Sequence, residues 1–509
     1  MKFGSQLGCT FVMALTVIGC SRQDAAVVYR RAATLTVLHS GDEREVLTPL
    51  RYPAQFLIFA SLVQHDGNGE ITPALAQSWQ HSPDYREWTF NLRTDVRWHD
   101  GVPFTARDVR FTKELFPKLW GVANPAEVRV LDDSTLTLLF AEPTDALDWW
   151  EVVYPEHLLK GLDPADFWEW EFWAHPVGVG PYRFVGSVPQ TMLELEANPD
   201  YYAGKPRIER LVLKFGDTPL TELLAGGVDV ASVERADLLK LRADPRFRVY
   251  DQLFPGMGWR YGIYWNHRDP LFQDPAVRRA LTLAIDRREL RQVLNLPADL
   301  PVVDVLFTGR QWRRGEVPEG LPYEPGRAAA MLDEVGWRDA DGDGIREREG
   351  VEFRFTALAP QEGQLDKAAL YVQESLRQVG IRMEIQSAGP GLRLVRERVR
   401  SGRYQALFSR FDLGDSVDRE GIFGEDSWLG YQNGEVTRLV EEIPSAVDPE
   451  TRDSIHRTLW PFLQEDLPAV FLYPLVMTFV ADRRVRGLES PFRADPVMHA
   501  EELWLEDRE

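Results

Sequence analysis

Cysteine is almost absent from this sequence. The 509 residues include two cysteines, Cys9 and Cys20, and both fall within the first twenty positions. The remainder of the chain has no thiol. This absence excludes an internal disulfide, a cysteine nucleophile and a thiolate metal site after Cys20.

Basic residues and histidines are also scarce. The 58 Lys and Arg residues face 79 Asp and Glu residues, so the formal net charge is −21. Nucleic-acid binding requires clustered positive charge, and this balance argues against a nucleic-acid partner. None of the nine histidines forms an HxxxH or HExxH pair, which argues against a zinc site.

Long apolar runs are missing after residue 20, so no later segment is expected to span a membrane. Before it, Lys2 and the apolar residues 7–19 form the pattern of a secretory signal sequence. The run ends in VIGC at Cys20, which resembles the lipobox of bacterial lipoproteins. This resemblance implies removal of residues 1–19, a lipid on Cys20 and an extracytoplasmic protein held at a membrane by the tether 20–33. An ordinary signal peptide with a chance cysteine is the alternative.

Sequence signatures of common enzymes are absent too. The chain contains no G-x-S-x-G, no P-loop and no G-x-G-x-x-G. We therefore expect no catalytic residues, no cofactor and no enzymatic activity, and a surface hydrolase is kept only as a remote alternative.

Helical and strand patterns alternate along most of the chain, which predicts a mixed α/β fold, and the length favours two or three domains. Trp88, Phe90 and Leu92 alternate with polar residues, and Val96 and Trp98 continue the two-residue period. This period predicts an antiparallel hairpin with its turn near Thr94 and Asp95.

The neighbouring His99 and Asp100 suggest a metal or acid/base site at first sight. Asp100-Gly101 is a turn signal, however, and Thr105 followed by Asp108 is close to a helix capping box. A tight turn and a capped helix account for the whole stretch, so we predict a structural element.

The loop DADGDGIREREG (339–350) is the clearest metal candidate. Asp339, Asp341 and Asp343 occupy positions 1, 3 and 5 of a calcium loop, with Gly344 at position 6. Position 12 is Gly350 where a bidentate Glu is needed. A weak calcium site and an ordinary solvated turn are the two interpretations, and the second is favoured.

The order of several motifs resembles the peptide/nickel-type solute-binding proteins of bacterial ABC importers, extracellular solute-binding protein family 5. The resemblance covers nearly the whole chain after the signal sequence. Its segments are PALAQSW (73–79), WTFNLRTDVRWHDGVPFTARDV (88–109), VGVGPYRF (177–184), NPDYYAGKPRIERLVLKF (198–215), GGVDVA (226–231), DPAVRRALTLAIDRREL (274–290), AAAMLDEVGWRDADGDG (328–344) and FLQEDLPAVFLYPL (462–475).

The family implies a two-lobed periplasmic-binding-protein (venus-flytrap) fold with an additional inserted domain. We expect lobe I to combine residues 34–60, 178–270 and 479–509, the inserted domain to span 61–177, and lobe II to span 271–478. Ligand would bind between the lobes of a monomer, and permease subunits of an ABC importer would recognise the closed form.

Ligand residues transfer from the family only in part. Peptide-binding members place an acid in a Gly-Trp-x-Gly-Asp-x-x-Asp-Pro segment against the ligand's ammonium group. The counterpart FDLGDSVDRE (411–420) offers Asp415 and Asp418, but it lacks the Trp and the Pro. Trp265 and Asn266, at the strand end after which the chain is expected to change lobes, are cleft candidates, and Tyr473 is a weaker one. Each of these three could equally be core.

Two ligand classes therefore remain open. The first is a short peptide, which the family and Asp415 favour. The second is another small solute, such as an oligosaccharide or a nickel chelate, because the Asp415 segment is altered and tryptophan is abundant.

Overall fold

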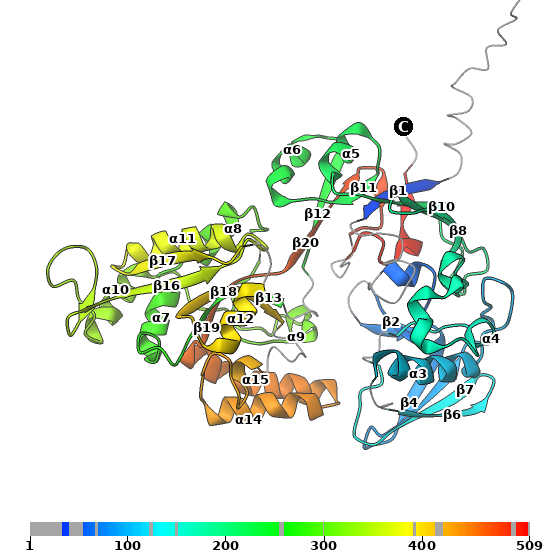
Figure 1. Ribbon diagram of the computed structural model, residues 1–509, viewed down its shortest axis with the longest axis horizontal. Helices are drawn as coiled ribbons and strands as arrows, with labels where there is room; N and C mark the ends of the chain where they lie inside the picture. The colour runs from blue at the N-terminus through cyan, green and yellow to red at the C-terminus, as the bar shows by residue number, and fades with distance from the viewer. Residues whose placement is uncertain are drawn as a thin grey trace, which may run out of the picture.

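The computed structural model describes residues 33–39, 54–66, 70–121, 126–147, 151–253, 259–298, 300–389, 393–412, 421–489 and 495–506. Two large sheets dominate it and lie in separate halves of the molecule (Figure 1). Helices pack on both, so the predicted mixed α/β fold is confirmed. Among the described helices, none has the length and apolar character needed to cross a membrane.

The first sheet has seven strands in the order β12-β20-β11-β1-β10-β9-β8. Its central strand β1 pairs in parallel with β10 and β11. Apolar residues of β1 face two cores, one of which is covered by α5 and α6. The bounds are β1 (Thr34–His39), β8 (Tyr182–Val188), β9 (Met192–Ala197), β10 (Arg210–Phe215), β11 (Val230–Ser232), β12 (Phe247–Leu253), β20 (Val476–Asp482), α5 (Pro219–Ala225) and α6 (Leu238–Ala243).

The second sheet has five strands in the order β17-β16-β18-β13-β19. Helices α7, α10 and α11 cover one face, and α12, α14 and α15 cover the other, because alternate side chains of each strand point to opposite faces. The bounds are β13 (Trp259–Trp265), β16 (Arg354–Ala359), β17 (Arg382–Ser387), β18 (Ala406–Asp412), β19 (Ala469–Pro474), α7 (Pro275–Leu283), α10 (Pro325–Glu334), α11 (Leu365–Arg377), α12 (Arg393–Ser401), α14 (Gly434–Glu442) and α15 (Pro449–Asp466).

The chain passes between the two sheets twice, from β12 to β13 and from β19 to β20. These strands stay paired on both sides of the passage, with Leu253 opposite Val476 and Arg260 opposite Pro474. The sheet membership corrects the predicted limits. The predicted lobe I runs to residue 270 and so includes β13. In the structure this strand hydrogen-bonds to β18 and β19 of the second sheet.

A smaller unit lies beside the first sheet and combines α3 with a four-stranded sheet, β4-β5-β7-β6. The predicted burial of Trp88, Phe90 and Leu92 is confirmed, but the predicted turn at Thr94 and Asp95 is wrong. The strand β5 pairs instead with β4 before it and with β7 after it. The bounds are α3 (Ala106–Trp120), β4 (Ala76–His81), β5 (Glu87–Leu92), β6 (Ala126–Asp132) and β7 (Thr135–Phe140).

Shorter elements complete the described chain. They are β2 (Val63–His65), β3 (Ile71–Pro73), β14 (Glu347–Arg348), β15 (Val351–Glu352), β21 (Val485–Arg486), β22 (Trp504–Leu505), α4 (Glu156–Leu159), α8 (Arg287–Val293), α9 (Gly309–Arg313) and the 3-10 helices η1 (Ala54–Leu57), η2 (Pro164–Glu169), η3 (Glu171–Ala174), η4 (Arg235–Asp237), η6 (Ile443–Ser445) and η7 (Ala500–Glu502).

Candidate functional site

The passage between the two sheets is the natural place for a site. Trp259, the first residue of β13, lies opposite Asp412, the last residue of β18. Ligands of α/β proteins bind where strands end and where two domains meet, since side chains from several segments converge there. We therefore describe the side chains at this end of the five-stranded sheet.

Two tyrosines form an aromatic wall at this end. The rings of Tyr261 and Tyr473 stack with their centroids 4.9 Å apart, and the Tyr473 hydroxyl donates a hydrogen bond to the Gly363 carbonyl at 2.8 Å. A side chain at position 363 would meet the Tyr261 ring at 2.4 Å, so glycine is required there. Burial holds the pKa of Tyr473 well above its usual value, and its hydroxyl stays neutral.

Charged groups lie next to this wall. The Arg410 guanidinium is 3.4 Å from the Glu362 carboxylate, and both side chains are about one quarter exposed, at 28% and 24%. Arg260, on the neighbouring strand, is buried and lies 4.2 Å above the Phe307 ring. The end of the sheet thus presents both signs of charge beside aromatic rings, which suits a ligand that has polar ends and an apolar body.

Arg235 joins the two halves of the molecule. It belongs to η4, beside the seven-stranded sheet, and donates to the Asn295 carbonyl after α8 at 2.9 Å. The same guanidinium donates to the Thr478 hydroxyl at 2.8 Å and lies 3.4 Å from Asp251. Burial lowers the pKa of Arg235. The side chain therefore ties both passing strands, β12 and β20, to the second half.

A second set of contacts joins the halves away from the passage. Arg313 of α9 pairs with Glu70 at 2.8 Å, and Arg452 of α15 lies 3.8 Å from Asp145. Burial, and next the positive charge of Arg313, lowers the pKa of His65 to about 4. The smaller unit thus faces the second half directly.

Trp265 does not lie at this site. Its side chain is 0% exposed and stacks on Phe272 at 4.8 Å within the core of the five-stranded sheet. The chain passes between the sheets before Trp259, and Trp265 ends β13 at the opposite end of that strand. The prediction of a cleft position for Trp265 was wrong because the passage was placed after the strand.

Asn266 has a structural contact at the same far end. Its amide donates to the Tyr404 carbonyl at 2.7 Å, and its side-chain oxygen accepts from the Arg268 amide at 3.1 Å. Among the predicted ligand residues that the structure describes, only Tyr473 lies near the passage, and its side chain is 4% exposed within the core of the five-stranded sheet. Asp415, Asp418 and the lipidation candidate Cys20 lie outside the described residues.

His99 is part of a structural tie. Its Nδ1 accepts from the Gly178 amide at 3.2 Å and its Nε2 lies 3.1 Å from the Gly180 carbonyl, which fixes the tautomer that carries hydrogen on Nε2. Burial lowers the pKa of His99 to about 4. The capping box of Thr105 and Asp108 is present at the start of α3. The predicted turn and helix cap of this stretch are confirmed, and the His99 contacts are an addition that the sequence did not indicate.

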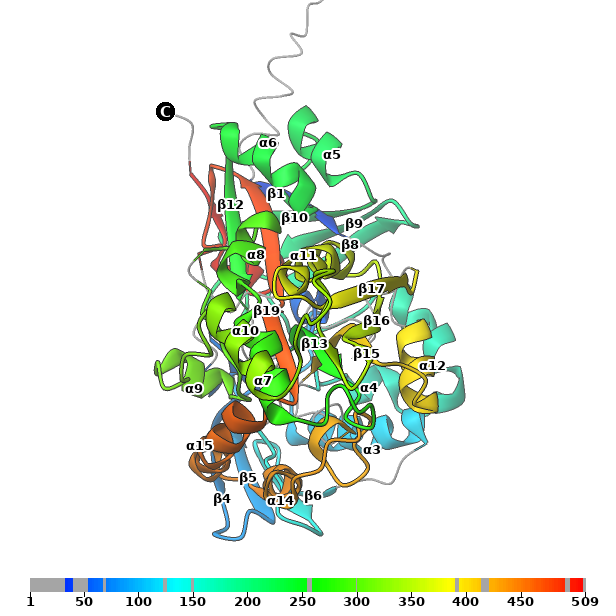
Figure 2. The same ribbon diagram turned by 90° about the vertical axis from the view of Figure 1, so that its left-hand side faces the viewer.

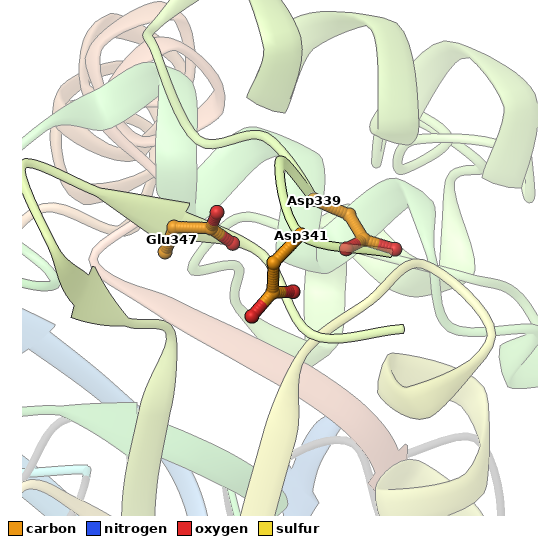
Figure 3. Close-up of side chains that lie close together, drawn as sticks. All are labelled: Asp339, Asp341 and Glu347. Carbon is orange, nitrogen blue, oxygen red and sulfur yellow. The ribbon is translucent and has the colours of Figure 1, made fainter. Parts of the chain in front are cut away.

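The acidic loop brings a different set of carboxylates together than the sequence indicates. Asp339, Asp341 and Glu347 lie within 4.8 Å of one another (Figure 3), whereas Asp343 caps the Ile345 amide at 2.8 Å. The Asp339 carboxylate accepts from the Gly342 and Gly344 amides. These bonds are those of an ordinary solvated turn, and calcium binding by this loop stays a prediction.

Sequence reasoning missed Tyr261, Arg260, Arg410, Glu362 and Arg235. A weak signal was present, because Arg260, the one charged residue of WRYGIYW, is at the start of the strand. It could be interpreted only once that start was known to adjoin the passage.

Comparisons with known proteins agree with this architecture. A model of the bacterial extracellular solute-binding proteins, family 5 (middle), matches residues 70–421. The chain is 26% identical over 448 residues to the oligopeptide-binding protein AppA of Bacillus subtilis, covering 82% of this chain and 80% of AppA. The structure of AppA with a nonapeptide has a TM-score of 0.65 at 23% identity, covering 93% of this chain and 99% of AppA. NikZ from Campylobacter jejuni with Ni(L-His) has a TM-score of 0.69 at 22% identity, covering 93% and 99%.

Proposed function

The chain belongs to the bacterial extracellular solute-binding proteins of family 5, and we propose that it captures a short peptide between its two halves and delivers it to an ABC importer. The family makes it an extracytoplasmic binding protein of an ABC transporter rather than an enzyme, so the hydrolase alternative is set aside. The main observation in favour of a peptide ligand is the match to AppA, an oligopeptide-binding protein, over 82% of this chain.

The side chains at the described end of the five-stranded sheet support the proposal of a peptide ligand. A peptide has an ammonium group at one end, a carboxylate at the other and repeated amides between them. Glu362 and Arg410 offer the opposite charges, and they lie beside the buried Tyr261–Tyr473 pair. Charge-assisted hydrogen bonds to both ends would orient the chain without reading its sequence.

Asp415 is the proposed partner of the ligand's ammonium group, with Asp418 as the second acid. This assignment comes from the family motif, and the altered residues around it, Asp412 and Arg419, set this chain apart from that motif. We further propose that Cys20 carries a lipid and that the protein acts as a monomer near the permease subunits.

Titration calorimetry tests the peptide directly. Peptides of two to nine residues should bind without being cleaved, and Asp415→Ala should weaken binding about 10-fold or more, because the proposed charge-assisted bond to the ligand is lost. Asp426→Ala, at an exposed acid of the same half, is the matched control and should bind as the parent protein does. A flat titration with every peptide would refute the peptide proposal.

A nickel chelate or another small solute is the second candidate. The observation in its favour is that NikZ, solved with Ni(L-His), shares the fold over 93% of this chain. Mass spectrometry of the molecule that co-purifies with the protein distinguishes the two candidate ligand classes. A peptide mass supports the first candidate, and a metal complex or a saccharide mass supports the second.

A further inference from the structure

The helix α12 carries an arginine stripe, Arg393, Arg396 and Arg400, on a protein whose net charge is −21. The spacing of three and four residues places these side chains on one face of the helix. All three are exposed, while Val395 and Val399 bury the opposite face against the five-stranded sheet. Glu397 is the single acid within the helix.

The stripe has no acidic partner among the described residues. No described carboxylate oxygen lies within 4 Å of its guanidinium groups. Other exposed helix arginines of the same half do have partners. Arg377 pairs with Glu374 at 2.7 Å, and Arg438 pairs with Glu435 at 2.8 Å. Among the described residues, this cluster of positive charge is therefore left without a carboxylate within 4 Å.

Helix stability does not explain the stripe. Arg393 and Arg396 lie in the first turn of α12, where the helix dipole disfavours positive charge. Arg396 and Arg400 are four residues apart, so they also repel each other. These repelling arginines share one exposed face and have no described carboxylate within 4 Å, which suits a function outside the chain.

We propose that the arginine stripe forms the docking surface for an acidic segment of the importer's permease subunits. The inference rests on the proposed transport role. Arginine favours planar carboxylates through paired hydrogen bonds, and acidic side chains are the charge complement of three exposed guanidinium groups on one helix face. Figure 2 shows α12 at the rim of the molecule, where a partner could approach it.

An anionic lipid surface is the less favoured partner. The protein as a whole carries a net charge of −21, so a negatively charged bilayer repels it at long range. A local acidic segment of a protein can approach the stripe without meeting the remainder of that charge.

The experiment compares two double charge reversals in the full-length protein. Arg396→Glu with Arg400→Glu tests the stripe, and Arg377→Glu with Arg438→Glu is the control with the same change of charge on the same half. Binding to the importer in phosphatidylcholine nanodiscs is measured by interferometry at low and at physiological salt. We expect the stripe variant to bind about 10-fold or more weakly and to lose most of its salt dependence, with the control unchanged.

Three further measurements make the outcome decisive. Melting by circular dichroism shows that each variant is folded, and peptide calorimetry shows that ligand binding is intact. Importer binding that is unchanged in the stripe variant overturns the docking surface, whereas a parent protein that does not bind the importer refutes the transport role itself. Binding of the parent to phosphatidylglycerol vesicles, lost in the stripe variant while importer binding persists, would assign the stripe to lipid and also overturn the proposal.

Discussion

Gly178 and Gly180 lie where two segments of backbone nearly touch. A Cβ atom at position 178 would be 1.8 Å from the Ile58 carbonyl oxygen, and one at position 180 would be 2.6 Å from the Ile58 carbonyl carbon. The Gly180 amide donates to the Ile58 carbonyl at 2.7 Å, and this bond holds the return of the chain from the smaller unit to the first sheet. The backbone cannot move away from a side chain without breaking that bond.

Gly178→Ala should therefore lower the free energy of unfolding by about 3 kcal/mol, since the added methyl group overlaps the Ile58 carbonyl. Urea unfolding followed by fluorescence measures the change. Gly186→Ala is the control, because its Cβ would meet no atom within 4 Å, and it should stay within about 0.5 kcal/mol of the parent. Equal stability of the two variants would contradict the close approach.

His99→Ala should affect stability and leave ligand affinity unchanged. The substitution removes the ring contacts to Gly178 and Gly180, so the free energy of unfolding should fall by about 2 kcal/mol. Calorimetry with a bound peptide should return the parent affinity. A large loss of affinity in a fully folded variant would show that His99 contacts the ligand.

At the scale of elements, α8 is fixed by a buried ion pair between Arg287 and Asp304. Both side chains are 1% exposed. The Arg287 guanidinium also donates to the Leu321 carbonyl at 2.9 Å and to the Phe471 carbonyl at 3.3 Å. One side chain thus joins α8, the segment around Asp304 and β19.

Asp304→Asn should lower the free energy of unfolding by about 3 to 5 kcal/mol, because it leaves the Arg287 charge buried without a counter-ion. Chemical denaturation provides the measurement. The double variant Arg287→Met with Asp304→Leu should recover much of the loss, since it removes both charges. If the single variant is as stable as the parent, the pair is not desolvated.

At the scale of the whole molecule, three histidines couple stability to pH. Burial is the main cause that lowers the pKa values of His65, His99 and His267, each to about 4. The unfolded histidines, with pKa values of about 6.5, bind protons between pH 6.5 and 4 that the native protein does not bind. Stability should therefore fall as the pH drops through this window.

Each of these histidines can contribute up to about 3 kcal/mol to that fall. The urea midpoint should decrease steadily from neutral pH to about pH 4.5. In His99→Gln, which cannot titrate, the slope should be smaller by about one third. A midpoint that does not change with pH would show that the three rings are protonated in the native protein.

Local order could be predicted from the sequence wherever neighbouring residues decide it. The capping box of Thr105 and Asp108 depends on a spacing of three residues. The burial of alternate residues in β5 follows from a two-residue period. The prediction of a turn near Thr94 was wrong, because a two-residue period does not identify the partner of a strand.

The site depended on contacts that span the chain. The sequence shows that Trp265 ends a strand, but it does not show which end of that strand adjoins the passage. Arg235 carries no local signal, although it contacts Thr478 and Asn295. The family, the mixed α/β class and the position of the helices follow from sequence, since ordered motifs and periodicity are local properties. Tertiary structure alone decided which end of each strand adjoins the passage and which described charges have no nearby partner. Both depend on pairing between segments that are distant in the sequence.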